Sequence, residues 1–378
     1  MKKVMLVFGT RPEAIKMSPL VHALKADPMI FEVKVCITAQ HREMLDQVLE
    51  IFNITPDIDL DLMTKEQDLF DLTSSILLEM RRVLDENKPD IVLVHGDTTT
   101  ALATSLACFY KNIDVGHIEA GLRTYDIYAP FPEEFNRQVV SKITKYHFAP
   151  SETSRENLLI DGVNKKNIIV TGNTVIDALK NTIKNIKNDS NHRGEINNLL
   201  RDTLPFNFET DLFLLITGHR RENFGRGLIG ICQSIKKLSK KYPNYHFVYP
   251  VHLNPNVQQP VLEILNGIEN VHLIAPLDYE PFVWLLFHCY LVLTDSGGIQ
   301  EEAPSFGKPV LVMRDTTERP EALEAGTVEL VGSNQIKIID AVSSLIENKL
   351  LYEKMSKASN PYGKGEASII IKEFLKNL

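Results

Sequence analysis

The residues best suited to ligand chemistry follow an apolar strand that is predicted over residues 290–294. Ser296 ends this strand, and Gly297 and Gly298 then open a helix. Paired glycines at a helix start let a bulky anion approach bare backbone N–H groups, where the helix dipole also favours negative charge. Glu302, one turn into the helix, can accept hydrogen bonds from a sugar diol. The pattern therefore suits a nucleotide sugar, although a Gly-Gly turn by itself is more often a tight connection without a ligand.

A second anion site is predicted where the first strand, residues 4–8, runs into the sequence GTRPEAIKMSP. Pro12 suits the first turn of a helix, where its missing N–H costs nothing. Arg11 is predicted just before this helix and Lys16 one turn into it, so two cations lie near one helix start. The alternative for Lys16 is a solvated helix face, whereas we expect Arg11, in its rigid turn, to contact a ligand.

Three carboxylates are predicted at the ends of strands or at the start of a helix. Asp97 in HGDTTTALA and Glu119 in GHIEAGLR each follow an apolar strand, and Glu133 opens a helix after a Phe-Pro pair. Asp97 could instead be only a helix N-cap, and acids at helix starts are common for dipole reasons. Three acids that converge on one cleft can supply the acid and the base for proton transfer at carbon. Because no histidine-rich cluster accompanies them, a metal site is the weaker interpretation and none is predicted.

Basic residues follow the strand that is predicted over residues 212–217, in the run TGHRRENFGRG. His219 stands at the strand end, and Arg220 and Arg221 come next. Cationic side chains at a strand end suit a pyrophosphate. The alternative is an exposed loop in which Arg221 pairs with Glu222.

Such sites need a fold that gathers strand ends. Short apolar strands alternate with helices through most of the chain, which is typical of parallel sheets covered on both faces. Strands are predicted over residues 4–8, 33–38, 90–95, 115–119, 146–149, 212–217, 246–251, 271–274, 290–294, 309–313 and 328–331. Helices are predicted over residues 13–26, 41–52, 68–86, 98–110, 133–143, 229–241, 257–265, 280–288, 336–349 and 366–378.

A change in composition indicates two domains. Residues 180–201 are rich in Asn and Lys, and we place the domain boundary on the leading side of this stretch. The prediction is a Rossmann-like domain over residues 1–175 and a second one over residues 176–365. Open α/β sheets bind ligands at the carboxyl ends of their strands, so we expect the two domains to face each other across a cleft.

Composition narrows the class of protein. The chain has 378 residues, 44% of them apolar, and a net charge of −8, which disfavours nucleic acid and membrane surfaces as partners. Its cysteines are widely spaced in apolar segments, so we expect core thiols in a reducing cytoplasm; they are Cys36, Cys108, Cys232 and Cys289. The N-terminal apolar run is too short for a signal peptide, and no stretch is long enough to span a bilayer.

Six motifs, in this order along the chain, resemble those of the bacterial non-hydrolysing UDP-N-acetylglucosamine 2-epimerase family. They are GTRPE from Gly9, HGDTT from His95, HIEAGLR from His117, PFPEEFNR from Pro130, TGHRREN from Thr217 and TDSGGIQEEAP from Thr294. The resemblance implies the two-domain GT-B-type fold of many nucleotide-sugar glycosyltransferases, with the helix over residues 366–378 crossing back to the first domain. It also implies reversible conversion of UDP-N-acetylglucosamine to UDP-N-acetylmannosamine, usually by a homodimer, with no metal or other cofactor.

The resemblance further implies roles for single residues. Because the hydrogen at sugar C2 is not beside a carbonyl, UDP must leave C1 first, or nearly first, and loss of the C2 proton then gives a 2-acetamidoglucal. The diphosphate trap would comprise Arg11, His219, Ser296, Gly297 and Gly298. Asp97, Glu119 and Glu133 would move the proton, with Lys16 neutralising charge near them. Glu302 would hold the ribose and Arg319 would lie near the phosphates. Phe282 would pack on uracil, or is a core aromatic.

Many bacterial members of the family carry a second, activating nucleotide-sugar site. The residues of this sequence that match it are Gln40, His41, Gln67, Arg220 and His252. However, Glu66 stands where an arginine is expected beside Gln67, and Glu43 stands where some members have glutamine. An acid in place of a phosphate-binding arginine weakens such a site, so we expect weak or no activation by substrate.

Three other functions use the same nucleotide site. A GT-B glycosyltransferase would pass the sugar to an acceptor and would need no acids for a C2 proton. A hydrolysing epimerase would release free N-acetylmannosamine. A non-catalytic sensor would keep Glu302 and the glycine turn but would not need the three acids. The epimerase interpretation, with a product that supplies surface polysaccharides, is therefore favoured.

Overall fold

A computed structural model describes residues 1–38, 42–62 and 67–378, except for the side chains of Arg42 and Glu43. The chain divides into two compact units. Unit 1 comprises Met1–Ala178 and Tyr362–Leu378, and unit 2 comprises Leu179–Pro361. Each unit is an α/β structure built on one parallel sheet, as the alternation of strands and helices predicts.

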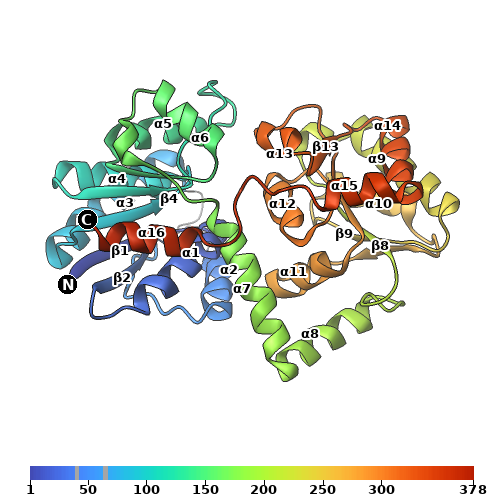
Figure 1. Cartoon of the computed structure of the whole chain (residues 1–378), viewed down its shortest axis with the longest axis horizontal. Helices are drawn as coiled ribbons and strands as arrows, with labels where there is room; N and C mark the ends of the chain where they lie inside the picture. Colours follow the sequence, from blue (N-terminus) through green and yellow to red (C-terminus); the bar gives the residue numbers. More distant parts are fainter. Residues whose placement is uncertain (39–41, 63–66) are drawn as a thin grey trace. The chain divides into compact units, whose positions relative to one another are not determined.

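Unit 1 contains a seven-stranded sheet in the order β3-β2-β1-β4-β5-β6-β7, and its neighbouring strands are parallel (Figure 1). The strands are β1 (Lys2–Phe8), β2 (Phe31–Ile37), β3 (Ile58–Asp59), β4 (Ile91–His95), β5 (Asp114–Ile118), β6 (Tyr146–Ala149) and β7 (Ile168–Val170). The helices are α1 (Arg11–Lys25), α2 (Arg42–Ile51), α3 (Leu69–Asn87), α4 (Thr99–Tyr110), α5 (Glu133–Ile143), α6 (Glu152–Ile160), the start of α7 (Thr174–Asn188) and α16 (Ala367–Lys376). This strand order is the doubly wound one, with its switch point between β1 and β4.

Unit 2 repeats the topology in a six-stranded sheet of order β10-β9-β8-β11-β12-β13, again parallel. The strands are β8 (Phe213–Thr217), β9 (His246–Pro250), β10 (Val271–Ile274), β11 (Leu291–Thr294), β12 (Val310–Val312) and β13 (Val328–Leu330). The helices are α8 (Ser190–Thr203), α9 (Arg226–Lys241), α10 (Pro255–Leu265), α11 (Tyr279–His288), α12 (Gly297–Glu302), α13 (Pro320–Glu324), α14 (Gln335–Glu347) and α15 (Lys349–Ser356). Here the switch point lies between β8 and β11.

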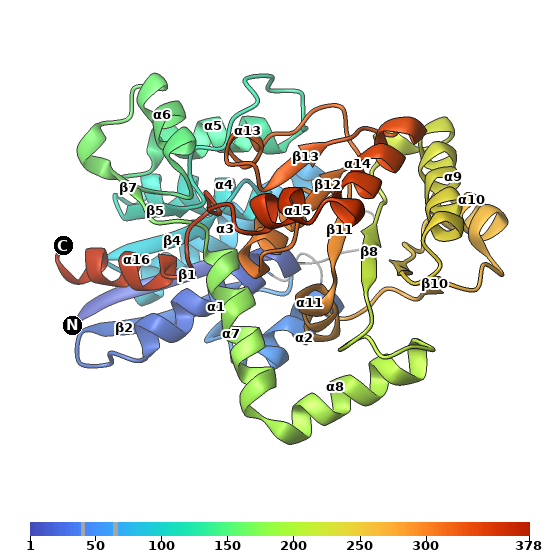
Figure 2. The same ribbon diagram turned by 45° about the vertical axis from the view of Figure 1, so that its right-hand side comes forward.

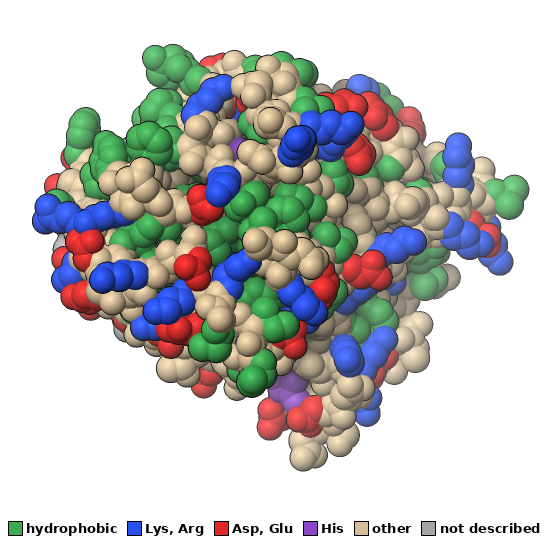
Figure 3. Space-filling view, turned by 60° about the vertical axis from the view of Figure 1, so that its left-hand side comes forward, with side chains coloured by type: hydrophobic (Ala, Val, Ile, Leu, Met, Phe, Trp, Pro, Cys, Tyr) green, Lys and Arg blue, Asp and Glu red, His purple; other side chains and the backbone are tan. Residues whose placement is uncertain are grey.

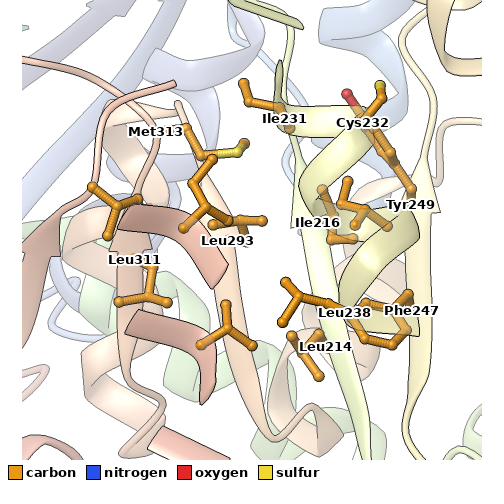
Figure 4. Packing of buried hydrophobic residues seen from close by; sticks show 14 of the residues in the cluster. Leu214, Ile216, Ile231, Cys232, Leu238, Phe247, Tyr249, Leu293, Leu311 and Met313 are labelled. Carbon is orange, nitrogen blue, oxygen red and sulfur yellow. The ribbon is translucent and has the colours of Figure 1, made fainter. Parts of the chain in front are cut away.

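One apolar cluster of the unit 2 core lies between its sheet and α9. Figure 4 shows side chains from the sheet beside those of α9; the labelled ones include Leu214, Ile216, Leu293, Ile231 and Leu238. Tyr249 is also fully buried there. Its hydroxyl donates a hydrogen bond to the Gly218 carbonyl at 3.0 Å, so the buried polar group has a partner. This hydrogen bond links β9 to the residue that follows β8.

The C-terminal helix packs within unit 1, beside α1 (Figures 1 and 2), which confirms the predicted return of the chain to the first domain. The ring of Phe374 lies edge-on to Tyr146 and Phe148, with centroid distances of 5.3 and 5.5 Å. Buried Asp177 of α7 accepts hydrogen bonds from the first backbone N–H groups of α16, those of Ala367 and Ser368, at 3.2 and 2.9 Å. These groups have no partner within their own helix, so Asp177 fixes where α16 begins.

Two local predictions about helix starts and strands were wrong. Helix α1 begins at Arg11 rather than at Glu13, because Thr10 is its N-cap and forms a capping box with Glu13. Arg11 therefore belongs to the first turn. No strand was predicted between α2 and α3, but Ile58–Asp59 form the short strand β3, which pairs with β2.

Residues 180–201, for which no element was predicted, are largely helical. They belong to α7 and α8, which follow one another (Figure 2), and α7 begins in unit 1 and continues into unit 2. A narrow apolar stripe is enough to anchor these helices, because Ile183, Ile186, Ile196 and Leu200 are buried while the Asn and Lys side chains lie mostly outside.

The surface carries both signs of charge. On the face shown in Figure 3, basic and acidic side chains are interspersed among apolar ones. All four cysteines are free and buried, as predicted. Among the described residues, no helix is long and apolar enough to cross a membrane.

Candidate active site

Buried Glu13 joins two motifs at the switch point of unit 1. Its Oε2 accepts the backbone N–H groups of Gly9 and Thr10 at 3.0 and 2.8 Å, and its Oε1 accepts the Thr98 hydroxyl at 2.7 Å. Burial raises the pKa of Glu13, while these hydrogen bonds oppose the increase. Glu13 thus fixes the turn that precedes α1 against the turn that precedes α4.

Glu119 follows β5 directly and adopts a left-handed backbone conformation, with φ of +62°. Such a conformation is strained for a residue other than glycine and is often found at functional sites. The Glu119 Oε2 atom accepts hydrogen bonds from Lys16 Nζ and, at 2.8 Å, from Asn173 Nδ2. The structure thus pairs the predicted cation of α1 with the predicted acid of β5, so the solvated-face alternative for Lys16 is wrong.

Two buried histidines, His95 and His117, lie near Glu119. His95 is buried at the end of β4, and its Nε2 is 3.7 Å from Glu119 Oε2. Burial lowers the pKa of His95 to about 4, and that of buried His117 in β5 to about 4. His117 Nε2 donates to the Gly96 carbonyl at 2.6 Å. Both imidazoles are therefore uncharged at neutral pH.

Asp97 is held by α5 rather than by the helix it precedes. Thr98, not Asp97, is the N-cap of α4, and its hydroxyl accepts the Ala101 N–H. The Asp97 carboxylate instead accepts Arg137 Nε at 2.8 Å and Nη2 at 2.6 Å, while its carbonyl accepts the Asn136 amide at 2.8 Å. The N-cap interpretation of Asp97 is therefore wrong.

The two acids at the start of α5 have different environments. Glu134 is fully buried, and its carboxylate accepts the N–H groups of Thr124 and Tyr125 and an Arg137 guanidinium N–H, at 3.1 to 3.2 Å. Glu133 is half-buried, and its buried Oε2 has no hydrogen-bond partner within the described parts of the chain. Glu134 therefore organises the preceding loop, whereas Glu133 retains acceptor capacity.

In unit 2, buried Asp295 organises the basic turn after β8. Its carboxylate accepts the backbone N–H groups of His219 and Arg220 at 3.0 and 2.9 Å, and the Asn223 amide at 3.1 Å. The imidazole of His219 stacks on that of His252, with centroids 5.3 Å apart. Partial burial, together with His252 and Arg220, lowers the pKa of His219, although Asp295 opposes this. Asp295 thus holds the backbone that carries His219 at the switch point between β8 and β11.

Arg319 lies over the glycine turn that follows β11. A Cβ atom on Gly297 would come within 2.6 Å of Arg319 Nη1 and 2.9 Å of its Cζ. Arg319 Nε donates to buried Glu301 at 2.5 Å, and Nη1 lies 3.5 Å from Glu318. Because Gly297 has no side chain, the guanidinium group of Arg319 fits beside its backbone.

A second arginine ties the neighbouring segments together. Arg314 is buried after β12, and it donates to Glu222 at 2.5 Å and to Glu318 at 2.9 Å. Glu222 is thus paired with Arg314 and not, as the loop alternative proposed, with Arg221. The ion pairs connect the basic turn after β8 with the segment that carries Arg319.

A family model described as UDP-N-acetylglucosamine 2-epimerase matches residues 22–376. The chain belongs to this family. It is 57% identical to the UDP-N-acetylglucosamine 2-epimerase of Yersinia pestis and 56% identical to that of Escherichia coli (strain K12), over 99% of this chain and 98% of each relative. A crystal structure of the Neisseria meningitidis UDP-GlcNAc 2-epimerase bound to UDP-GlcNAc is 53% identical, with a TM-score of 0.90 over all of both chains. These similarities confirm the family and the fold class that the six motifs predict.

For the other residues that the family resemblance assigns to the site, the structure gives mainly their burial and their position in an element. Arg11, Phe282 and Glu302 are half-buried, at the starts of α1 and α11 and at the end of α12. Ser296 precedes α12 and has a backbone N–H that donates to the Thr294 hydroxyl at 2.9 Å. Gly298, the second glycine of the turn, has more room, because its nearest neighbour for a Cβ is Glu302 Oε1 at 3.4 Å.

The predicted activating site is only partly described. Gln40, His41 and Glu66 lie outside the described residues, as does the side chain of Glu43. Gln67 donates its amide to the Leu62 carbonyl at 3.0 Å. Arg220 and His252 are exposed, and His252 is the residue on which His219 stacks.

Several residues that shape the site were not predicted: Glu13, Arg137, Asn173, Asp295 and Glu301. Only Glu13 had a clear local signal, because Thr-x-x-Glu before an apolar run is a capping box. Among the described residues, no group of three or more His, Cys, Asp or Glu is arranged to hold a metal ion.

Proposed function

We propose that this chain interconverts UDP-N-acetylglucosamine and UDP-N-acetylmannosamine by inverting sugar C2 through a 2-acetamidoglucal. Membership of the epimerase family supports this proposal. The observation that carries it is the ion pair of Glu119 with Lys16 at the carboxyl edge of the unit 1 sheet. A glycosyltransferase would need no carboxylates to move a proton at C2, although it can use one base to activate its acceptor.

The first step of the proposed reaction is elimination. The bond from C1 to the UDP oxygen breaks, the C2 proton passes to a carboxylate, and a C1=C2 double bond forms. Departure of UDP is favoured by donors aimed at the diphosphate. In unit 2 these are the turn at Ser296, Gly297 and Gly298 together with His219 and Arg319. From unit 1 we assign Arg11, which stands in the first turn of α1.

The second step reverses the first with opposite configuration. A proton returns to C2 from the other face, and the UDP oxygen adds to C1. We assign the proton transfers to Asp97, Glu119 and Glu133, with Lys16 neutralising charge beside Glu119. Carboxylates held by different partners can differ in proton affinity, which suits one of them to accept a proton and another to donate one.

The rest of the substrate is assigned by family match. Glu302 would accept the ribose hydroxyls, and half-buried Phe282 would pack on uracil. We also propose that binding of a second UDP-N-acetylglucosamine is weak, because Glu66 adds a negative charge beside Gln67. A clearly sigmoidal dependence of rate on substrate would contradict this.

We further propose that the chain acts as a homodimer in the cytoplasm, supplying surface polysaccharide synthesis. Four free, buried thiols agree with a reducing compartment. Two neighbouring helices, α3 and α4, expose large apolar side chains: Phe70, Leu78, Phe109 and Tyr110 are 85, 56, 57 and 65% exposed. Exposed apolar surface of this kind is typical of a protein interface.

The deciding experiment is NMR of the purified protein with UDP-N-acetylglucosamine in D2O. We expect UDP-N-acetylmannosamine carrying deuterium at C2, without accumulation of free sugar. Release of UDP with free N-acetylmannosamine would indicate hydrolysis instead. No reaction, with UDP still binding, would leave the transferase or sensor function.

A further inference from the structure

Asn173 is a buried residue that contacts a proposed proton-transfer group from a distant part of the chain. It lies between β7 and α7 and is 2% exposed. Its side-chain Nδ2 donates to Glu119 Oε2 at 2.8 Å, across 54 residues of sequence. None of the six family motifs includes this residue.

The orientation of the Asn173 amide is set by its other contacts. Oδ1 accepts the Val175 N–H at 3.0 Å at the start of α7, so the nitrogen must face Glu119. The Asn173 backbone N–H donates to the Tyr362 carbonyl at 2.8 Å, in the segment that leads to α16. The backbone and the side-chain oxygen are therefore both fixed, and the donor is aimed at the carboxylate.

Glu119 needs such support because its own backbone does not adopt a relaxed conformation. At φ +62°, small backbone changes would move the carboxylate away from the strand end. Lys16 and Asn173 approach the same oxygen, Oε2, and together define its position. The lysine supplies charge on a flexible stem, whereas the asparagine is a short side chain anchored at both ends.

We propose that Asn173 is a positioning residue that holds Glu119 in the orientation required for proton transfer at C2. The proposal rests on the proposed function, in which Glu119 is one of the groups that exchange the C2 proton. Asn173 acts through Glu119 and is not assigned any contact with substrate. The competing explanation is that Asn173 only stabilises the start of α7.

The charged and titratable groups around Glu119 allow the two explanations to be separated by pH. Among the described contacts, these groups include Lys16 from α1, His95 from β4 and His117 from β5. Burial lowers the pKa of each histidine to about 4, so both remain neutral across the working pH range. A change in the pH dependence of kcat on substitution of Asn173 therefore does not come from these histidines, and among the three proposed acids Glu119 is the one that Asn173 contacts.

The test compares Asn173→Asp and Asn173→Ser with the wild-type chain. Both replacements keep an oxygen that can accept the helix N–H, so the start of α7 is preserved. Asp replaces the donor with a second carboxylate beside Glu119, whereas Ser withdraws the donor. The matched control is Asn157→Ser in α6, because the described side-chain hydrogen bonds of Asn157 are to the Gly121 carbonyl, at 3.0 Å, and to the Tyr125 hydroxyl, and neither partner is a proposed acid.

For Asn173→Asp we expect kcat at neutral pH to fall by roughly tenfold or more, with KM changed less than about twofold. The acid limb of the kcat profile should move up by about one pH unit, because a neighbouring carboxylate disfavours the ionised form of Glu119. Asn173→Ser should shift the profile in the same direction by less. Asn157→Ser should retain the wild-type kcat and profile.

Wild-type kcat and pH profiles in both Asn173 variants, even with lowered thermal stability, would overturn the proposal. If Asn173→Asp does not fold, the pH profile of Asn173→Ser decides the matter in the same way. Failure of the proposed function is distinct, since the wild-type chain itself would then incorporate no deuterium at C2.

Discussion

The carboxylate of Asp97 pairs with the guanidinium of Arg137, at 2.8 Å from Nε and 2.6 Å from Nη2. The guanidinium also contacts Glu134, so it would keep one carboxylate partner if Asp97 lost its charge. A substitution of Asp97 can therefore remove a proton acceptor while Arg137 stays in place through its contact with Glu134.

Asp97→Asn keeps the size of the side chain but cannot accept a proton. We expect kcat to fall by roughly 100-fold or more, while UDP affinity changes by no more than a few-fold. Turnover assays and calorimetric titration with UDP measure the two quantities. The control is Asp161→Asn, which weakens the 2.7 Å pair with buried Arg123 elsewhere in unit 1 and should lower stability without lowering kcat. Equal loss of UDP binding and turnover in Asp97→Asn would indicate a structural role.

The glycine turn of unit 2 makes a second prediction at the scale of single residues. In Gly297→Ala the new methyl group would come within 2.6 Å of Arg319 Nη1, so the guanidinium must shift and its hydrogen bond to Glu301 is weakened. We expect the free energy of unfolding of unit 2 to fall by roughly 1 kcal/mol, because the charged contact with buried Glu301 is weakened.

Gly298→Ala is the comparison for ligand-free stability, since its methyl group would approach only Glu302 Oε1, at 3.4 Å. Its effect on unfolding should stay below that of Gly297→Ala in denaturant titrations. Equal stability of the two variants would show that Arg319 is not held by the contact described.

At the scale of elements, the segment over residues 314–319, between β12 and α13, is held by ion pairs of Arg314 and Arg319. Burial alone would raise the pKa of Glu318, but hydrogen bonds from Arg314 and the charges of Arg314 and Arg319 outweigh it and lower the pKa to about 2. A carboxyl whose pKa is lowered in the folded state stabilises the fold above its ordinary value of 4.5. That contribution is lost as pH falls from 4.5 towards 2.

We therefore expect wild-type unit 2 to be more stable than Glu318→Gln at pH 7, by at most about 3 kcal/mol. The difference should shrink as pH falls below 4.5. Trp284 is the single tryptophan of the chain and lies in unit 2, so its fluorescence follows unfolding of that unit. Glu269→Gln, at an exposed position of the same unit, is the control. A stability difference that is independent of pH would contradict the assigned ion pairs.

For the whole molecule, the testable feature is self-association through α3 and α4. The side chain of Phe109 is 57% exposed on α4, and that of Phe70 is 85% exposed on α3. Burying such rings in an interface is favourable, and a charge in their place is not.

Phe70→Glu combined with Phe109→Glu should convert the proposed dimer into monomers, as measured by light scattering at micromolar concentration. The control is Leu350→Glu on α15 of unit 2, where an 80% exposed leucine is replaced in the same way. An unchanged mass in the double variant would place any dimer interface elsewhere.

Sequence patterns determined the fold class and most elements, because a parallel sheet buried on both faces requires continuous apolar strands separated by helices. They also located the polar residues at strand ends, such as Asp97, Glu119 and His219. The element that sequence analysis described least well was the stretch over residues 180–201, where widely spaced Ile and Leu side chains bury a narrow face.

Tertiary structure decided which of those side chains meet. Asn173 reaches Glu119 across 54 residues and Asp295 reaches His219 across 76, because the strand order brings β7 towards β5 and places β11 beside β8. Hydrogen bonds between strand ends depend on sheet order and register, which no local pattern encodes. The sequence thus determined the kinds of groups available for chemistry, and the packing of strands decided the partners that hold each of them.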